Sequence, residues 1–409
     1  MKEYFVMLGG NPLGKGALDK LHDFGYDVIV VDWNENPSLT GEHHIRLDVK
    51  DSVAVVNALA QTGYVVKGAM SFIDLAVPTV NAVNKWCGNV HMPAVFNEVI
   101  TKEQMRKCWQ KAGIFNRISE TDDNFTLDQV VEWSKKMKLI CKPNVAASSR
   151  GITILPLGQS KEIIYAAISR AKDYSFDNKC LMEEFVEGRE FTVDMLGDSY
   201  GNVSCYGISV KYHSPYAINN RTATKIHWNS NVYPDDVYRK IAERGKNCYR
   251  AMGLKSSFGH LEMIMKDDGT LTPVEIGARS SGFISSHLVS AAAECDYLGD
   301  YVKMLHGEAI DNVDHICSNM SAMWYGYDMP TNSKLIKEGY LTDYLPKGIE
   351  TMYSDHHGLV LGRQFGPVID DNTRDNIGYE MLKGPKELLT LSNVLEAEYK
   401  FIANNLNLD

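Results

Sequence analysis

The chain has 409 residues, of which 44% are hydrophobic and 23% charged, as in an ordinary globular protein with two or three domains. Its formal net charge of −10 and the lack of a Lys/Arg-rich run argue against a surface that binds nucleic acid. No apolar run approaches the ~18 residues of a membrane span, and no apolar leader precedes the first strand. The eight cysteines are scattered without a C-x-x-C pair, which is typical of reduced thiols, so we expect a cytoplasmic protein.

Strands and helices alternate over the first hundred residues. Short apolar runs predict strands at residues 4–10, 26–33, 44–49 and 67–74. Helical patterns cover residues 14–25 and 52–63. Such alternation implies a parallel, doubly wound sheet, and we expect this α/β domain to span residues 1–98.

A mixed α+β region follows. Helices are predicted at residues 101–113, 127–137 and 160–174, the first of them N-capped by Thr101. Strands are predicted at residues 139–144, 179–186, 189–198 and 202–213. The last hundred residues give weaker signals, a strand at 321–328 and a helix at 386–406. We therefore expect a second domain over residues 99–308 and a small α+β domain over 309–409.

A glycine-rich loop from Gly9 to Gly16 connects the first predicted strand to the first helix. Asp32 ends the next strand, near the offset of about 20 residues that marks a dinucleotide-binding loop. A nicotinamide-dependent dehydrogenase is therefore one alternative. Against it, the strict G-x-G-x-x-G spacing is absent and Pro12 lies within the loop, which also fits a structural turn or a substrate-contacting loop.

Two glutamates stand in one predicted hairpin. The runs LEMIM and TLTPVEI flank a D-D-G turn at 267–269, and an Asp-Gly step between apolar runs is a strong hairpin signal. If the strands pair, Glu262 and Glu275 can face the same side, and carboxylates are natural ligands of Mg²⁺. Arg279 follows four residues later and suits a phosphoryl or carboxylate oxygen. The alternative is a surface hairpin with two solvated glutamates.

Two further segments carry residues that suit a nucleotide. Lys142 ends an apolar strand and precedes a loop of small residues that includes Ser148 and Ser149. Small residues let backbone N–H groups approach a polyphosphate, and the lysine adds a positive charge. The next strand carries four acids between Glu183 and Glu190, which can accept hydrogen bonds from an adenine amino group and ribose hydroxyls. Taken singly, these segments also fit a surface loop and a solvated edge strand.

In chain order, these pieces resemble the ATP-grasp superfamily. The motifs are a capped helix with Lys102, a strand lysine before a small-residue loop, the strand EEFVEGREF and the glutamate hairpin that ends EIGARSSG. The likeness covers roughly residues 1–310. The chain looks most similar to carboxylate–amine ligases that join amino acids into dipeptides, and next to purine-pathway ATP-grasp ligases. The fold implied is the N-terminal doubly wound α/β domain, an ATP-grasp domain pair with central and lid subdomains, and the C-terminal α+β domain.

The resemblance implies a nucleotide site in the second domain. Lys102 and Lys142 would hold the phosphates of ATP, with Ser148 and Ser149 in the loop beside them. The implied contacts to the nucleoside are Glu183 to the adenine amino group, Glu184 and Val186 to the base through their backbones, and Glu190 to the ribose.

The resemblance also implies metal ligands and catalytic residues. Glu262 and Glu275 would bind one or two Mg²⁺ ions, with Mn²⁺ as an alternative. Many members of the superfamily have Asn two residues after the second glutamate, where this chain has Gly277, so the number of metals stays open. The residues implied to act on the reacting groups are Arg279 on the phosphoryl group or acyl-phosphate, Lys211 on the γ-phosphate and His260 beside the first metal ligand.

The reaction implied is phosphorylation of a carboxylate by ATP, followed by attack of an amine on the acyl-phosphate and release of phosphate. The implied partners are ATP and a small carboxylate and amine, with no nucleic acid or membrane. A homodimer is expected as the commonest arrangement of soluble enzymes. Two alternatives stay open: another ATP-grasp enzyme such as a purine-pathway ligase or a carboxylase, and a nicotinamide enzyme or non-catalytic nucleotide-binding protein.

Overall fold

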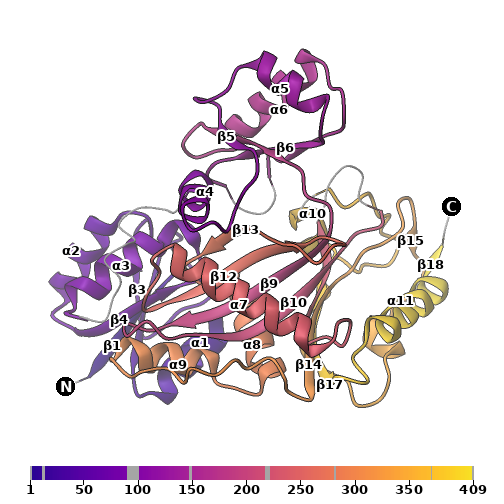
Figure 1. The fold of residues 1–409 in the computed structure, drawn as a ribbon. Coiled ribbons are helices and arrows are strands. Elements are labelled where there is room, and N and C mark those ends of the chain that lie inside the picture. Colours follow the sequence, from indigo (N-terminus) through magenta and orange to yellow (C-terminus); the bar gives the residue numbers. More distant parts are fainter. Residues whose placement is uncertain are drawn as a thin grey trace.

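The computed structural model describes residues 2–11, 14–89, 101–146, 150–216, 222–280, 282–369 and 371–407 (Figure 1). In this part of the chain a parallel sheet comes first, a small antiparallel sheet second and a large antiparallel sheet third. This mixed α/β and α+β architecture confirms the predicted fold class. Among the described helices, none is long and apolar enough to cross a membrane.

The N-terminal domain is a four-stranded parallel sheet in the order β3-β2-β1-β4. Its strands are β1 (Glu3–Leu8), β2 (Asp27–Asp32), β3 (His43–Arg46) and β4 (Val65–Ser71). Its helices are α1 (Lys15–Asp23), α2 (Ser52–Thr62), the 3₁₀ turn η2 (Asp74–Ala76) and α3 (Val77–Trp86). The apolar strands are covered on both faces, as parallel sheets require: α2 and α3 pack on one face, and α1 packs on the other. The four predicted strands are confirmed, and α3 was not predicted.

Residues 118–184 form a small lobe that projects from the rest of the molecule (Figure 1). Its sheet is antiparallel throughout, in the order β5-β8-β6-β7. Its elements are β5 (Ser119–Thr121), α5 (Leu127–Ser134), β6 (Leu139–Pro143), β7 (Thr153–Leu155), α6 (Lys161–Asp173) and β8 (Cys180–Glu184). The helix α4 (Lys102–Lys111) precedes the lobe in the chain, and a capping box of Thr101 and Gln104 fixes its start.

The body of the molecule is built on an eight-stranded antiparallel sheet, hereafter the central sheet, in the order β13-β12-β9-β10-β11-β14-β17-β16. Its strands are β9 (Arg189–Gly197), β10 (Val203–His213), β11 (Ala223–Trp228), β12 (Ser257–Met265), β13 (Leu271–Gly277), β14 (Met320–Gly326), β16 (Glu350–Asp355) and β17 (Tyr379–Pro385). The helix α7 (Asp235–Ala251) covers one face. The helices α8 (Gly282–Ala293) and α9 (Tyr297–Leu305) cover part of the other face.

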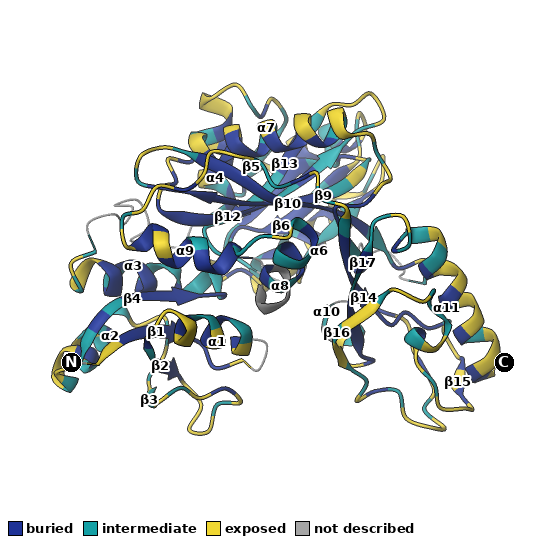
Figure 2. Ribbon diagram, turned by 90° about the horizontal axis from the view of Figure 1, so that it is seen from below, coloured by how far each residue is buried: buried dark blue, intermediate teal, exposed yellow. Residues whose placement is uncertain are grey.

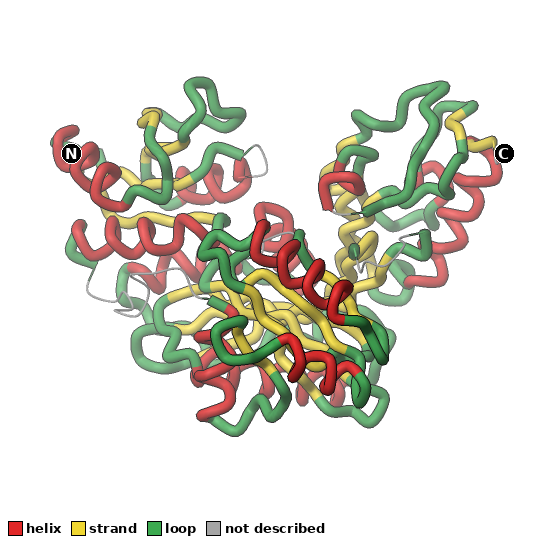
Figure 3. Tube along the Cα trace, turned by 90° about the horizontal axis from the view of Figure 1, so that it is seen from above, coloured by secondary structure: helices red, strands yellow, loops and turns green. Residues whose placement is uncertain are grey.

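The C-terminal part continues the central sheet through β14, β17 and β16. Its remaining elements are β15 (Lys334–Leu335), η3 (Leu341–Tyr344), α10 (Asp371–Asp375), α11 (Leu391–Asn405) and β18 (Leu406–Asn407). The helix α11 packs on the sheet through Val394 and Phe401, and it lies on the opposite side of the molecule from the N-terminal domain (Figures 2 and 3). Strands from before and after residue 308 belong to the same central sheet, so the sheet itself does not mark a boundary at that residue. The domain limits stay a prediction.

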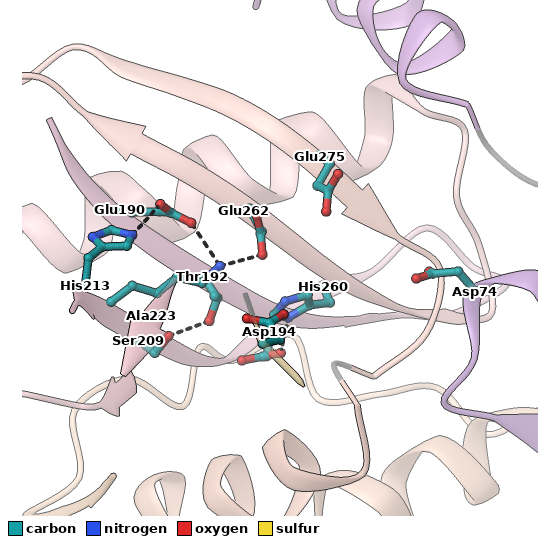
Figure 4. A network of polar contacts seen from close by, with 12 residues as sticks. Asp74, Glu190, Thr192, Asp194, Ser209, His213, Ala223, His260, Glu262 and Glu275 are labelled. Atoms are coloured by element: carbon teal, nitrogen blue, oxygen red, sulfur yellow. Dashed lines mark hydrogen bonds and ion pairs between the residues drawn. The ribbon is translucent and has the colours of Figure 1, made fainter. Parts of the chain in front are cut away.

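The two-residue period of the strands decides which side chains are available for chemistry. Along β9, Phe191 and Val193 point into the apolar core under α7, so Glu190 and Thr192 lie on the opposite face. The strands β10 and β12 keep the same alternation. Three adjacent strands therefore present polar side chains on one face of the central sheet (Figure 4).

Candidate active site

Glu262 and Glu275 lie directly opposite each other on β12 and β13. The two strands pair in antiparallel register, with these two residues as partners. The hairpin turn is closed by a hydrogen bond from the amide of Lys266 to the carbonyl of Thr270. Neither carboxylate is fully buried, since the side chains are 24% and 36% exposed. The hairpin and the shared face predicted from the sequence are therefore present in the structure.

Lys211 on β10 joins two of the acidic strands. Its Nζ lies 2.5 Å from Glu262 and 2.9 Å from Glu190, and His213 Nε2 lies 3.1 Å from the other oxygen of Glu190 (Figure 4). Burial alone would lower the pKa of Lys211, but the two carboxylates raise it above its ordinary value. Burial would raise the pKa of Glu190, but Lys211 and His213 lower it. Lys211 and Glu190 therefore stay charged.

Lys102 reaches the same site from the first turn of α4. Its Nζ lies 2.9 Å from Glu275 Oε2 and 3.4 Å from the carbonyl of Ala146. Burial would raise the pKa of Glu275, but the charges of Lys102, Lys142 and Lys211 outweigh burial and hold it at about 2. The predicted metal ligands thus each contact a lysine that was predicted to bind phosphate.

Lys142 on β6 contributes the third lysine, from the small lobe. Its Nζ lies 2.9 Å from Glu183 Oε2 on the adjacent strand β8. The same carboxylate accepts two hydrogen bonds from Arg106, at 2.6 and 3.1 Å, and one from Ser119 at 2.6 Å. Its four acceptor positions are therefore filled. The adenine contact predicted for Glu183 stays a prediction, and in this structure the carboxylate serves the protein itself.

The other predicted nucleotide contacts lie on or just after β8. Glu184 Oε1 lies 3.4 Å from Arg117, and Val186 is buried in the segment that leads to β9. These positions run along the connection between the small lobe and the central sheet. Ser148 and Ser149 lie outside the described residues. The base-binding roles stay predictions.

His260 belongs to a buried polar chain that lies beside the glutamates on the same face of the central sheet (Figure 4). Its Nδ1 lies 2.8 Å from Asp194 Oδ1, and the other oxygen of Asp194 accepts a hydrogen bond from Trp228 Nε1 at 2.9 Å. Asp194 is fully buried. This pairing fixes the ring of His260 two residues from Glu262, and the catalytic role of His260 stays a prediction. Asp194 was not predicted as part of the site, although its polar character in an apolar strand was an available signal.

Arg279 contacts the N-terminal domain. Its Nη2 lies 2.5 Å from Asp74 Oδ2, while its Nη1 donates to the carbonyl of Ser280. A Cβ atom added at Gly277 would lie 3.0 Å from Asp74 Oδ1, so a larger residue there would crowd this carboxylate. Asp74 was not predicted as part of the site. It follows the last strand of a parallel sheet, at the edge where such sheets bind ligands, and this position was a usable signal.

Asp32 is engaged within the N-terminal domain. Its Oδ2 accepts a hydrogen bond from the amide of Gly10 at 2.7 Å, and its Oδ1 accepts from the backbone and side chain of Asn34 at 2.8 Å. A dinucleotide-binding domain needs this carboxylate for a ribose hydroxyl. Its contacts here favour a structural role for the glycine-rich loop. Pro12 lies outside the described residues.

The residues present fit a magnesium ion that arrives with a phosphate. In the described ranges no group of three or more His, Cys, Asp or Glu side chains could hold a metal. Glu262 and Glu275 offer two adjacent carboxylates, and Mg²⁺ is usually held by one or two carboxylates plus phosphate and water. The two glutamates would hold the ion, with its other ligands from outside the protein.

Residues 135–287 match the family model described as "ATP-grasp domain". The chain is 23% identical over 298 residues to the D-alanine–D-alanine ligase of Pseudoalteromonas translucida, an alignment covering 71% of this chain and 90% of that protein. It is 24% identical over 154 residues to the D-alanine–D-alanine ligase of Geotalea uraniireducens, covering 36% and 45% of the two chains.

Solved structures share the fold over nearly the whole chain. The L-amino acid ligase of Bacillus licheniformis superposes with a TM-score of 0.75 at 16% identity, covering 99% of this chain and 98% of that one. The N5-carboxyaminoimidazole ribonucleotide synthetase of Thermotoga maritima gives a TM-score of 0.64 at 14% identity, covering 100% of both chains. At such identities the likeness establishes the architecture, and the choice of substrate needs its own evidence.

Proposed function

The chain contains an ATP-grasp domain, and from this premise we propose that it is an ATP-dependent ligase that joins an amino acid to an amine. The carboxylate would be phosphorylated by ATP, and the amine would attack the acyl-phosphate to release phosphate. The observation that carries the proposal is that three lysines lie in ion pairs with the glutamates of the candidate site. Lys102 and Lys211 contact the facing glutamates, and Lys142 enters from the small lobe.

The chain's own residues supply what phosphoryl transfer requires, namely positioning and positive charge. Lys102, Lys142 and Lys211 would bind the phosphates, and Glu262 and Glu275 would hold the magnesium ion. The ion, when bound, would neutralise charge on the transferring oxygens. As the phosphates arrive, Lys102 and Lys211 would exchange a carboxylate for a phosphate oxygen, whereas Lys142 would keep its contact with Glu183 and donate to a phosphate oxygen through another N–H.

The pair Arg279–Asp74 supports an amino acid as the substrate. A cation and an anion lie side by side, 2.5 Å apart, next to Glu275 at the border between the central sheet and the N-terminal domain. A zwitterion carries the complementary pair of charges: Arg279 would attract its carboxylate and Asp74 its ammonium group. The carboxylate would then lie near the phosphate-binding lysines.

Another ATP-grasp activity, such as a carboxylase or a purine-pathway ligase, is the second candidate. It is favoured by the likeness to the N5-carboxyaminoimidazole ribonucleotide synthetase. Both candidates would use the same lysines and glutamates, and they differ in the carboxylate that accepts the phosphoryl group and in the amine that attacks the acyl-phosphate. A nicotinamide enzyme is disfavoured by the contacts of Asp32.

The proposal includes one or two Mg²⁺ ions with Mn²⁺ as an alternative, a cytoplasmic location and a homodimer. The metal requirement is tested by activity with Mg²⁺, with Mn²⁺ and with a chelator. The dimer is tested by light scattering at several protein concentrations, where a monomer mass throughout would exclude it.

Phosphate release from ATP tests the reaction, measured across single amino acids, amino-acid pairs and small carboxylates, with product masses recorded. We expect release to require two amino acids and to give a product with the summed mass minus water. Release that requires bicarbonate or a ribonucleotide would replace the first candidate with the second. Absence of release with every substrate, together with ATP binding, would favour a non-catalytic nucleotide-binding protein.

A further inference from the structure

We propose that Arg106 is a positioning residue for the nucleotide: it holds the small lobe on α4 so that Lys142 stays at a fixed place relative to Lys102. The inference rests on the proposed function, in which both lysines contact the phosphates of ATP. Arg106 itself would touch neither nucleotide nor substrate.

The helix α4 is fixed to the body of the molecule along one side. Trp109 Nε1 donates a hydrogen bond to the carbonyl of Cys248 on α7, at 3.2 Å. The amide of Ile276 on β13 lies 3.4 Å from Met105 Sδ. Together with the contact between Lys102 and Glu275, these bonds hold α4 in a fixed position against α7 and β13.

The small lobe is linked to α4 at two positions along the helix. At the first turn, the amides of Lys102 and Glu103 donate to the backbone and side-chain oxygens of Asn144, at 3.2 and 3.0 Å. One turn later, Arg106 donates two hydrogen bonds to Glu183. A single link would let the lobe rotate about it, whereas two links a turn apart fix its orientation.

The guanidinium of Arg106 is itself held rigidly. Its residue is 2% exposed, and the group lies 5.4 Å from the ring centre of Trp109 and 4.8 Å from that of Phe115. Its two donors match the two carboxylate oxygens in the fork geometry that lysine lacks. Arg106 therefore fixes the position of the Glu183 carboxylate relative to α4.

Glu183 passes this position on to Lys142. The second oxygen of Glu183, which accepts from Arg106 Nη2, also lies 2.9 Å from Lys142 Nζ on the neighbouring strand. A lysine side chain has four flexible carbons, so a fixed acceptor is what gives its ammonium group a defined place. The chain of contacts from Arg106 through Glu183 thus sets the distance between the two phosphate-binding lysines.

A purely structural role would not need these charges. A buried ion pair costs desolvation, and an apolar pair of similar volume often supports a fold equally well. Here the pair joins a helix and a strand that each carry a phosphate-binding lysine. The test therefore compares nucleotide binding with stability.

The experiment measures ADP dissociation by calorimetry, thermal unfolding and steady-state kinetics for R106M, R106K and wild type. We expect R106M to weaken ADP binding by about tenfold or more, the effect of losing a charge-assisted contact. The KM for ATP should rise in parallel, while kcat at saturating ATP changes little. R106K should bind ADP with intermediate affinity, and it replaces R106M if that variant does not fold.

Two further variants isolate the mechanism. K107M removes an exposed neighbour on α4 that contacts only Glu103 among the described ion pairs, and it should leave ADP binding unchanged. R106M combined with E183Q should bind ADP no more weakly than E183Q alone, because Arg106 acts through Glu183. Equal ADP affinity in wild type and R106M would overturn the inference, whereas failure of the wild type to bind ADP would overturn the proposed function.

Discussion

The central sheet places acidic side chains in two regions, and each region treats them differently. On β9, β12 and β13, Glu190, Glu262 and Glu275 each contact a lysine. Beyond β14, Asp328 and Glu380 are buried against the hydroxyl groups of Ser214 and Tyr327, and Glu380 also contacts the ring of His356 at 3.2 Å. One oxygen of each of these two carboxylates has no hydrogen-bond partner in the described structure.

Glu275 and Asp328, one from each region, differ in pKa as a result. The lysines outweigh the burial of Glu275 and lower its pKa to about 2, whereas burial raises the pKa of Asp328 to about 6 because Ser214 and Lys225 offset it only in part. A carboxylate paired with a lysine can exchange that cation for a metal ion, whereas a carboxylate held by hydroxyl groups in the interior contributes to packing. This contrast distinguishes a candidate site from a structural cluster in one sheet.

The largest effect is expected from E262Q and E275Q. The amide keeps the size of the side chain and removes the negative charge that a magnesium ion needs, so ATP turnover should fall about a thousandfold. The measurement is phosphate release with the substrate identified as above. The matched control is E350Q, on the exposed edge strand β16, where turnover should be unchanged. Near-wild-type turnover in either first variant would remove these glutamates from the metal site.

K211M should have the next largest effect. The variant removes a phosphate-binding charge and leaves Glu190 and Glu262 facing each other without it, so turnover should fall about a hundredfold. K225M on the neighbouring strand is the comparison, because Lys225 is also buried but contacts Glu398 in the C-terminal part. That variant should lower the melting temperature and keep the turnover of the folded enzyme. An equal loss of turnover in K211M and K225M would contradict the assignment of the candidate site to one region and a structural role to the other.

D328N should have the smallest effect, and it depends on pH. Because the pKa of Asp328 is raised to about 6 in the folded protein, the folded state binds this proton more tightly than the unfolded chain. The carboxyl therefore costs stability as the pH rises from about 4 to 6, by roughly 2–3 kcal/mol above pH 6. D328N should unfold at a higher temperature than wild type at pH 8 and lose this advantage below pH 4. A pH-independent difference would contradict the raised pKa.

Several parts of the fold could be predicted because they depend on neighbours in sequence. The parallel domain follows from apolar runs separated by helical patterns, and the hairpin follows from the Asp-Gly turn between strands of period two. The same period placed Glu262 and Glu275 on one face, as the structure shows. The C-terminal part gave weak signals because its short strands gain stability from joining the central sheet.

The contacts that organise the site could not be predicted in this way. Arg279 and Asp74 are 205 positions apart, and Arg106 and Glu183 are 77 apart. Nothing in the local pattern of α4 distinguishes Arg106 from the exposed Lys107 except its place on the buried side of the helix.

The sequence by itself determined the four strands of the N-terminal domain, the chemical kinds of residues at the site and the facing pair of glutamates, because these depend on backbone period and turn chemistry. Only the tertiary structure decided which cation meets which carboxylate. Lys102 contacts Glu275, Lys211 contacts Glu262, and Arg106 forms an ion pair with Glu183. The physical reason is that an ion pair requires its partners within about 4 Å, and the packing of sheets and helices sets that distance for residues far apart in the chain.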